Sequence, residues 1–336
     1  MPALLDRLKR PLRDLRVSVT DRCNLRCRYC MPREVYGPGF EFLDRDDLLT
    51  FEEIARITRA FARNGVTKVR LTGGEPLLRR DLPALVRMLA DIDGIDELAL
   101  TTNALLLPSV AGPLRDAGVD RLTVSLDALD DPTFRRMSDT RRAVGDVLEG
   151  IDAAMRAGFP PPKINAVVRR GVNEHAVVDL AAFGRQLGST VRFIEFMDVG
   201  HTNGWSREEV VPAEEILDAL ASRWELDPVG ERGTAPAERY RYRDGGGEIG
   251  VIASVTRPFC RTCVRARLSA VGELFTCLFA TVGRDLRAVV RSGATAAELD
   301  EVIGTVWSER RDRYSEERRD EPAADPARVE MSYIGG

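Results

Sequence analysis

A chain of 336 residues is long enough for one large domain or two ordinary ones. Its composition, 44% hydrophobic and 30% charged, is typical of a soluble globular protein. The net charge of −4 gives no bulk electrostatic case for nucleic acid or an anionic membrane as a partner. The N-terminal segment carries charges where a signal peptide needs an apolar run, and no later stretch approaches about 18 apolar residues. We therefore expect a cytoplasmic protein that binds neither nucleic acid nor membrane.

From residue 15 to about residue 224, short β-branched runs alternate with amphipathic stretches. This alternation is typical of repeated strand–helix units with a parallel sheet. About six units can be counted, which predicts an α/β fold with a partial (βα)6 TIM-type barrel, open along one side because a closed barrel has about eight. The strands are expected at 15–20, 68–72, 97–101, 121–126, 163–168 and 191–196.

The stretches between these strands have the pattern of amphipathic helices. Thr50 precedes the first of them and Glu53 stands three residues later, which predicts a capping box at the helix start. The helices are expected at 51–64, 82–91, 110–117, 144–157, 176–187 and 213–223.

Polar or backbone-accessible residues recur where the predicted strands end. In barrels built from strand–helix units, ligands bind where strands end and loops begin. The recurrence therefore predicts that one face of the barrel is lined for a ligand. These endings are Thr20, Thr72-Gly73-Gly74, Thr101-Thr102-Asn103, Ser125 with Asp127, and Met197-Asp198.

The pattern changes after residue 224, where prolines and glycines interrupt the alternation. We place a domain boundary near 225, with the barrel at 1–225 and a smaller C-terminal α+β domain at 226–336. The run 309–321 mixes charges of both signs, which predicts a solvated helical face or tail. Within the C-terminal domain, strands are expected at 235–242, 249–255, 267–270 and 274–278, and helices at 284–291 and 296–314.

Three of the six cysteines, Cys23, Cys27 and Cys30, form a C-x3-C-x2-C group. Four thiolates fill a structural zinc site or an iron–sulfur cube, whereas three ligands leave one metal position open for chemistry. Six cysteines in 336 residues are too sparse for a disulfide-stapled protein. Zinc is the stronger alternative, but its short sites usually contain paired C-x2-C groups, and no histidine lies nearby. The spacing favours an iron–sulfur site.

Cys260, Cys263 and Cys277 form a second group of three, spaced C-x2-C-x13-C. On spacing alone, a zinc site with one further ligand and an iron–sulfur site are equally compatible with it. Arg265 and Arg267 follow two residues apart, and they lie on one face if the segment is extended. Arginine offers permanently ionised, bidentate donors for a polyanion such as a triphosphate.

The first cysteine group, followed by the run Thr72-Gly73-Gly74-Glu75-Pro76, resembles the radical S-adenosylmethionine superfamily. The resemblance implies that the three thiolates hold three irons of a [4Fe–4S] cluster and that the fourth iron binds S-adenosylmethionine. An electron from the cluster would then split the sulfonium to give a 5′-deoxyadenosyl radical. The fold that the resemblance implies is a partial barrel, in agreement with the alternation of strands and helices.

The segment 259–269, followed by Cys277, closely resembles the C-terminal motif of one family in this superfamily, the GTP 3′,8-cyclases. The resemblance spans nearly the whole chain and includes 193–200 and the terminal Gly335-Gly336. It implies a second [4Fe–4S] cluster on the second cysteine group, with an open iron that contacts the guanine base of GTP. It also implies a lyase that cyclises GTP to (8S)-3′,8-cyclo-7,8-dihydroguanosine 5′-triphosphate, the first step of molybdenum cofactor (molybdopterin) biosynthesis.

The resemblance assigns roles to individual residues. Lys163 is expected near the start of its strand rather than at its end, so either the substrate reaches deep into the barrel or the predicted register is wrong. S-adenosylmethionine would be held by Tyr29, Gly74, Ser125 and Met197. GTP would be bound by Arg16, Arg70, Thr101, Lys163, Arg265 and Arg267, with Lys68 and Arg192 as further candidates.

In the family, the terminal pair Gly335-Gly336 reaches into the active site, where the absence of side chains lets the backbone enter a narrow space. The residues alone indicate only a frayed terminus. No acid–base pair stands out in the sequence, and neither His175 nor His201 is assigned a catalytic role. Ala104 departs from the family pattern, in which glycine is expected.

The resemblance also implies partners. These are an electron donor such as a flavodoxin or ferredoxin system, and the molybdenum cofactor biosynthesis protein C, which takes the product; a homodimer is a further expectation. Two other functions are open on the sequence: a radical S-adenosylmethionine peptide-modifying enzyme, and an iron–sulfur carrier or sensor without catalysis. Peptide-modifying enzymes usually carry more cysteines in the C-terminal region.

Overall fold

The structure is a computed structural model that describes residues 4–318 and 328–335. Within these residues, twelve strands form one mixed sheet. The strands are β1 (Asp14–Ser18), β2 (Lys68–Thr72), β3 (Glu97–Thr102), β4 (Arg121–Ser125), β5 (Lys163–Val168), β6 (Val191–Glu195), β7 (Leu226–Pro228), β8 (Glu238–Tyr242), β9 (Glu248–Ile252), β10 (Arg265–Leu268), β11 (Glu273–Phe275) and β12 (Arg284–Asp285). Their order across the sheet is β12-β11-β10-β1-β2-β3-β4-β5-β6-β9-β8-β7.

The first six strands lie side by side in chain order and are all parallel, so the predicted partial barrel of strand–helix units is confirmed. The C-terminal part of the chain extends this wall at both edges, since β10 pairs in parallel with β1 and β9 pairs in parallel with β6. The outermost strands continue in antiparallel fashion. The domain boundary near 225 stays a prediction, and strands from both sides of it share the sheet.

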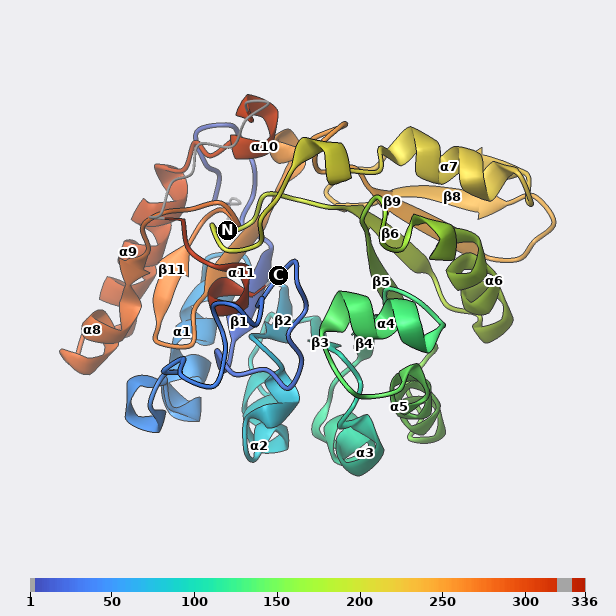
Figure 1. The fold of residues 1–336 in the computed structure, drawn as a ribbon. Coiled ribbons are helices and arrows are strands. Elements are labelled where there is room, and N and C mark those ends of the chain that lie inside the picture. The colour runs from blue at the N-terminus through green and yellow to red at the C-terminus, as the bar shows by residue number, and fades with distance from the viewer. Residues whose placement is uncertain (1–3, 319–327, 336) are drawn as a thin grey trace.

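Helices cover the outer side of the wall. Figure 1 shows the strands as an arc with helices along its outside, while the short last helix lies inside the arc beside β1. In the described ranges, no helix combines the length and the apolar character of a membrane span. The helices are α1 (Phe51–Arg63), α2 (Leu82–Ala90), α3 (Leu107–Ala117), α4 (Asp131–Ser138), α5 (Val144–Arg156), α6 (Val177–Leu187), α7 (Ala213–Ala221), α8 (Leu286–Arg291), α9 (Ala296–Ser308), α10 (Tyr314–Glu317) and α11 (Met331–Ile334).

The hydrophobic core lies between the wall and these helices. Successive side chains of a strand point to opposite faces, so Leu15 and Val17 of β1 share the outer face with Val69 and Leu71 of β2, their partners in register. All four are buried in the same core as Phe61 of α1. Each such side chain contributes about 1.5–3 kcal/mol on burial. The outer face therefore stabilises the wall and leaves the inner face free for polar residues.

The predicted capping box at the start of α1 is confirmed. The Thr50 hydroxyl accepts the Glu53 N–H at 3.2 Å, and the Glu53 carboxylate accepts the Thr50 N–H at 2.8 Å. Two N–H groups that lack partners within the helix are thereby satisfied. The start of the helix is thus fixed by local sequence alone.

Two helices differ from the prediction. α3 begins at Leu107 rather than at residue 110, because Pro108 occupies the first turn, where a missing N–H is tolerated. α4 is absent from the prediction. Asp130 caps it by accepting the Thr133 N–H at 2.8 Å, and the short polar helix has too weak an apolar periodicity to be detected.

The helix predicted at 296–314 is too long. α9 ends at Ser308, and the chain then turns inward before α10. Arg310 is 4% exposed and the Arg318 side chain 3%. The solvated face predicted for 309–321 is therefore wrong at these positions, because the charged groups are buried in ion pairs; 319–321 lie outside the described residues.

Ala104, where the resemblance predicts glycine, lies buried just after β3 in the left-handed region, with φ of 67°. This conformation costs an alanine about 1–2 kcal/mol. A Cβ added to Gly150 of α5 would lie 2.2 Å from the Ala104 carbonyl oxygen. The loop after β3 therefore packs against α5 at a distance that only glycine permits.

Gly150→Ala is expected to lower the free energy of unfolding by about 1–3 kcal/mol, because an overpacked contact forces the helix and the loop apart. Gly145 of the same helix has no atom within 4 Å of an added Cβ. Gly145→Ala is thus the matched control, and it is expected to be neutral or stabilising by up to about 1 kcal/mol. Urea unfolding measures both, and equal shifts in the two variants would contradict the close contact.

Candidate active site

The inner face of the wall carries polar side chains in register. Arg16 of β1 lies opposite Arg70 of β2 and Arg267 of β10, and Asp14 lies opposite Arg265. Partners in register on a parallel sheet point to the same side, so these side chains form rows across three strands. The inside of a closed barrel is normally filled by branched apolar side chains. The charged interior seen here indicates a ligand site instead.

The predicted site residues converge on one cavity of about 580 Å³ on this face. Its size lies within the range of small-molecule sites. The polar strand endings Asn103 and Asp127 also contribute to its wall. The predicted residues that line the cavity are Cys23, Cys27, Tyr29, Cys30, Gly74, Thr101, Ser125, Met197, Arg16, Lys68, Arg70, Lys163, Arg192, Cys260, Cys263, Arg265, Arg267 and Cys277.

The two cysteine groups lie at opposite ends of the strands. Cys23, Cys27 and Cys30 follow the carboxyl end of β1, whereas Cys260 and Cys263 precede the start of β10, which runs parallel to β1. The five residues of β1 span roughly 15 Å. Because both groups line the cavity, it runs along the inside of the barrel from one group to the other.

The loop with the first cysteine group is held against the end of β2 by close backbone packing. The Gly74 N–H donates to the Thr20 carbonyl at 2.9 Å, and the Glu75 N–H donates to the Arg22 carbonyl at 2.8 Å. An added Cβ would lie 2.4 Å from the Thr20 oxygen at Gly73, and 2.3 Å from the Arg22 oxygen at Gly74. The two glycines therefore allow the cysteine loop to pack closely against the barrel.

Buried carboxylates support this loop from the neighbouring strand ends. The Tyr29 hydroxyl donates to Asp127 at 2.8 Å. Glu75 accepts the Thr102 hydroxyl and the Asn103 N–H, each at 2.8 Å. Burial raises the pKa of Asp127 to about 6 and that of Glu75 to about 7. The hydrogen bonds fix the side chains, so the mouth of the cavity at the first group is held in one arrangement.

The second cysteine group is completed by Cys277, since β11 is antiparallel to β10 and returns the chain to the same end. Cations surround Cys263: Nη2 of Arg265 lies 3.4 Å and Nη2 of Arg310 lies 3.3 Å from its sulfur. Burial raises the pKa of this thiol, but the two guanidiniums outweigh burial and lower it to about 6. Burial raises the pKa of Cys277 to about 11.

The thiols of each group fit a cluster better than a single ion. All six cysteines are free. Charge interactions link Cys27 with Cys23 and Cys30, and Cys277 with Cys263. Within residues 4–318 and 328–335, no three His, Cys, Asp or Glu side chains are arranged to hold one metal ion. Three thiols in each group leave one iron of a [4Fe–4S] cluster open for a further ligand.

A cluster of cations lines the cavity between the two groups. Nε of Arg16 is buried and has no hydrogen-bond partner in the described chain. Arg70 donates to the hydroxyls of Thr101 and Thr123, at 3.2 and 3.1 Å. Burial and neighbouring arginines lower the pKa of Arg16, and they lower that of Arg192 to about 9. Guanidiniums stay ionised, so the lowered pKa values express first the burial of these charges and then their mutual repulsion, and a bound polyanion would offset both.

Lys163 is the first residue of β5, as predicted, and it lines the cavity. It pairs in register with Thr123 of β4. The predicted register is therefore right, and the cavity reaches the starts of the strands. Burial, followed by the charges of Arg121 and Arg192, lowers the pKa of Lys163 to about 8.

The C-terminal tail reaches the inner face of the barrel. α11 packs against β1, and a side-chain nitrogen of Arg267 donates to the Gly335 carbonyl. A Cβ added to Gly335 would lie 2.2 Å from the Thr72 side chain. Gly335 is therefore in contact with two residues of the cavity wall without lining it. Gly336 lies outside the described residues, so the role of the pair stays a prediction.

Comparisons with known proteins agree with this geometry. The model of the Radical SAM superfamily matches residues 17–184, and that of Molybdenum Cofactor Synthesis C matches residues 189–316. A GTP 3′,8-cyclase of Acidothermus cellulolyticus is 59% identical to the chain, with 98% of each covered. The chain belongs to the GTP 3′,8-cyclase family. A family member from Staphylococcus aureus is 47% identical, again with 98% of each chain covered.

A solved structure supports the fold of this family member. SuiB from Streptococcus suis, bound to S-adenosylmethionine, aligns with a TM-score of 0.62 and 15% identity, over 88% of this chain and 68% of that one. At such low identity the likeness concerns the fold alone. This likeness supports the predicted partial barrel, and the predicted family resemblance is confirmed by the family models and the relatives.

Sequence reasoning missed the residues that hold the second cysteine group, namely Arg10, Arg310 and Asp312, although all three line the cavity. No local pattern marks them, because their partners lie far away in the chain. Asn165 was missed as well. It stands two residues after Lys163 and shares its face of β5, so strand alternation could have indicated it.

GTP affinity is expected to be about tenfold weaker at pH 9 than at pH 7, because Lys163 loses its proton as the pH rises through its pKa of about 8. A bound polyanion favours the charged form, so binding is strongest below that pH. Lys163→Arg keeps the charge and is the control, with a nearly flat profile. Equilibrium dialysis at several pH values tests this, and parallel profiles for both proteins would contradict it.

Proposed function

We propose that this chain is a GTP 3′,8-cyclase. It converts GTP to (8S)-3′,8-cyclo-7,8-dihydroguanosine 5′-triphosphate at the start of molybdenum cofactor biosynthesis. The observation that carries the proposal is a single cavity with a group of three thiols at each end and a cluster of cations between them. Three thiols per group leave one iron of each cluster free for a ligand. The cations suit the triphosphate of a nucleotide.

The proposal assigns the cavity residues as follows. The terminal pair Gly335-Gly336 is assigned a role in the active site, although Gly335 does not line the cavity and Gly336 lies outside the described residues. The first [4Fe–4S] cluster is held by Cys23, Cys27 and Cys30, and the second by Cys260, Cys263 and Cys277. S-adenosylmethionine is bound near the first cluster by Tyr29, Gly74, Ser125 and Met197. GTP is bound by Arg16, Arg70, Thr101, Lys163, Arg265 and Arg267, with Lys68 and Arg192 beside them.

The first cluster, when bound with S-adenosylmethionine, supplies a 5′-deoxyadenosyl radical. The residues of the chain contribute position rather than acid–base catalysis. Arg16, Arg70 and Arg267 lie in register across three strands, so they can hold the triphosphate at fixed points. With the triphosphate held there, the ribose would lie between the two ends of the cavity, with its 3′ hydrogen toward the first group and the base toward the second.

Further partners belong to the same proposal. The electron enters from a small redox protein such as a flavodoxin or ferredoxin. The product passes to the molybdenum cofactor biosynthesis protein C. We place the enzyme in the cytoplasm, where thiols stay reduced, and propose that it forms a homodimer.

The test is anaerobic reconstitution of the full chain with iron and sulfide, followed by incubation with dithionite, S-adenosylmethionine and GTP. Mass analysis is expected to show 5′-deoxyadenosine together with a cyclised isomer of GTP. Formation of 5′-deoxyadenosine without consumption of GTP would contradict GTP as the substrate. It would still support a radical S-adenosylmethionine enzyme, such as a peptide-modifying enzyme. Failure to cleave S-adenosylmethionine would favour an iron–sulfur carrier or sensor.

Arg265→Ala and Arg267→Ala are expected to weaken GTP binding about tenfold to a hundredfold, because each removes a charged hydrogen-bond donor worth about 1.5–3 kcal/mol. Cleavage of S-adenosylmethionine in the absence of GTP is expected to be unaffected, since both residues lie away from the first cysteine group. Arg241→Ala is the control, because Arg241 is exposed on β8 and pairs with Glu248. Unchanged GTP affinity in both cavity variants would count against the assignment.

A further inference from the structure

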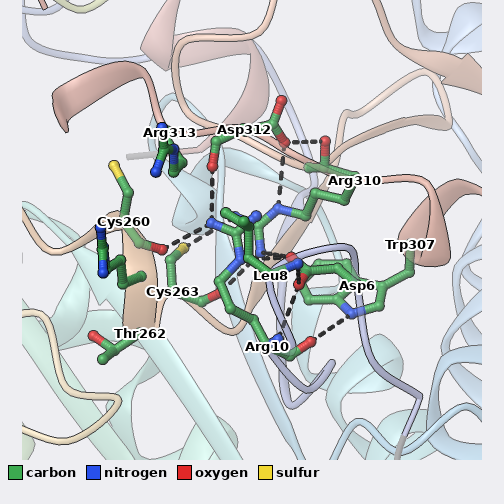
Figure 2. A network of polar contacts seen from close by, with 12 residues as sticks. Asp6, Leu8, Arg10, Cys260, Thr262, Cys263, Trp307, Arg310, Asp312 and Arg313 are labelled. Atoms are coloured by element: carbon green, nitrogen blue, oxygen red, sulfur yellow. Dashed lines mark hydrogen bonds and ion pairs between the residues drawn. The ribbon is translucent and has the colours of Figure 1, made fainter. Parts of the chain in front are cut away.

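A tight turn near the N-terminus lies against the second cysteine group. Asp6 closes this turn, since its carboxylate accepts the backbone N–H groups of Leu8 and Arg10, each at 2.9 Å, and the Arg10 Nε at 2.5 Å. The Asp6 and Arg10 side chains are 0% and 1% exposed. Figure 2 shows Arg10 between Asp6 and the cysteines. The turn therefore presents a buried, oriented guanidinium to the second group.

Arg10 connects the turn to two distant segments. Its Nη1 donates to the Cys260 carbonyl and to the Asp312 carbonyl, each at 2.8 Å. The Arg10 carbonyl accepts the indole N–H of Trp307 at 3.1 Å. The Arg10 side chain thereby ties the start of the cysteine loop to the segment after α9, while its backbone carbonyl binds α9 itself. Arg10 cannot move without breaking several buried hydrogen bonds.

Arg310 contacts the second cysteine of the group directly. Its Nη1 donates to the Cys263 carbonyl at 2.8 Å, and its Nη2 lies 3.3 Å from the Cys263 sulfur. The same side chain pairs with Asp6 at 3.6 Å and lies over the Trp307 ring at 4.5 Å. Its side chain is 2% exposed. Asp6 thus holds both arginines, and through them two of the three cysteines.

Asp312 extends the network to the third cysteine. Its carboxylate pairs with Arg310 at 3.3 Å and accepts the Thr276 hydroxyl at 2.6 Å. Thr276 directly precedes Cys277. Cys260 and Cys263 are therefore held at their own carbonyl groups, and Cys277 is held through the side chain of its neighbour Thr276.

The first cysteine group has a different environment. There the neutral amide of Asn103 lies 4.0 Å from the Cys23 sulfur, and among the described residues no guanidinium donates to a sulfur of this group. At the second group both Arg265 and Arg310 lie within 3.4 Å of the Cys263 sulfur. Hydrogen bonds and positive charge at a ligand sulfur stabilise the reduced cluster and raise its reduction potential.

We propose that Asp6, Arg10, Arg310 and Asp312 form a clamp that presets the second cysteine group and that Arg310 raises the reduction potential of the cluster held there. This inference rests on the second cluster of the proposed function. The four are positioning residues, because they act through the cysteines. Arg310 acts both on the position of Cys263 and on the charge at its sulfur.

The test uses reconstituted full-length protein and redox titration followed by electron paramagnetic resonance. A background with Cys23→Ala, Cys27→Ala and Cys30→Ala isolates the signal of the second cluster. Arg310→Gln is expected to lower the midpoint reduction potential of the second cluster by about 59 mV, which is a tenfold shift of a one-electron equilibrium. Arg310→Lys is expected to restore part of the lost potential. The control is Arg313→Gln, because Arg313 lies nearby but pairs with Glu316 and Glu317.

The possible outcomes distinguish a failure of the proposed clamp from a failure of the proposed function. Full iron content and an unchanged midpoint in Arg310→Gln would overturn the inference. Loss of second-cluster iron in Arg310→Gln but not in Arg313→Gln supports the clamp. If Arg310→Gln does not fold, Asp6→Asn is measured instead, and an unchanged midpoint there overturns the inference. If the unmutated second group binds no iron in this background, the proposed function itself fails at that site.

Discussion

The parallel pairing of β1 with both β2 and β10 is the constraint on which the site depends. Parallel strands share one carboxyl edge, so the loop that follows β1 and the segment that precedes β10 must lie at opposite ends of the wall. The first cysteine group occupies that loop and the second occupies that segment. Their separation, and the cavity between them, follow from strand direction alone.

The alternation of side chains along each strand explains how the wall tolerates a charged interior. Apolar residues face the helices and form the core, while Arg16, Arg70 and Arg267 face inward and repel one another. Burial of the outer face compensates for this repulsion. The interior is thus already arranged for a polyanion, and little reorganisation is needed when one binds.

Segments near the two ends of the chain complete the site. The turn around Asp6 reaches the second cysteine group. The tail is anchored by Arg328, which pairs with Asp198 at 3.3 Å, and Gly335 contacts Arg267. Segments far apart in sequence therefore contact both ends of the cavity. The positions of the cysteines depend on the whole fold for this reason.

The sequence by itself determined the six parallel strands of the barrel, most of the helices between them and the chemistry of the cysteine groups. Strand and helix periods, the capping box at Thr50 and the spacing of both cysteine groups are local patterns, and the resemblance added the residues that line the cavity. Only the tertiary structure decided that β9 and β10 extend the wall at both edges, and that Arg310 is buried rather than solvated. The physical reason is that strand pairing and the burial of charge depend on partners far away in the chain, such as Asp6 for Arg310, which no local pattern records.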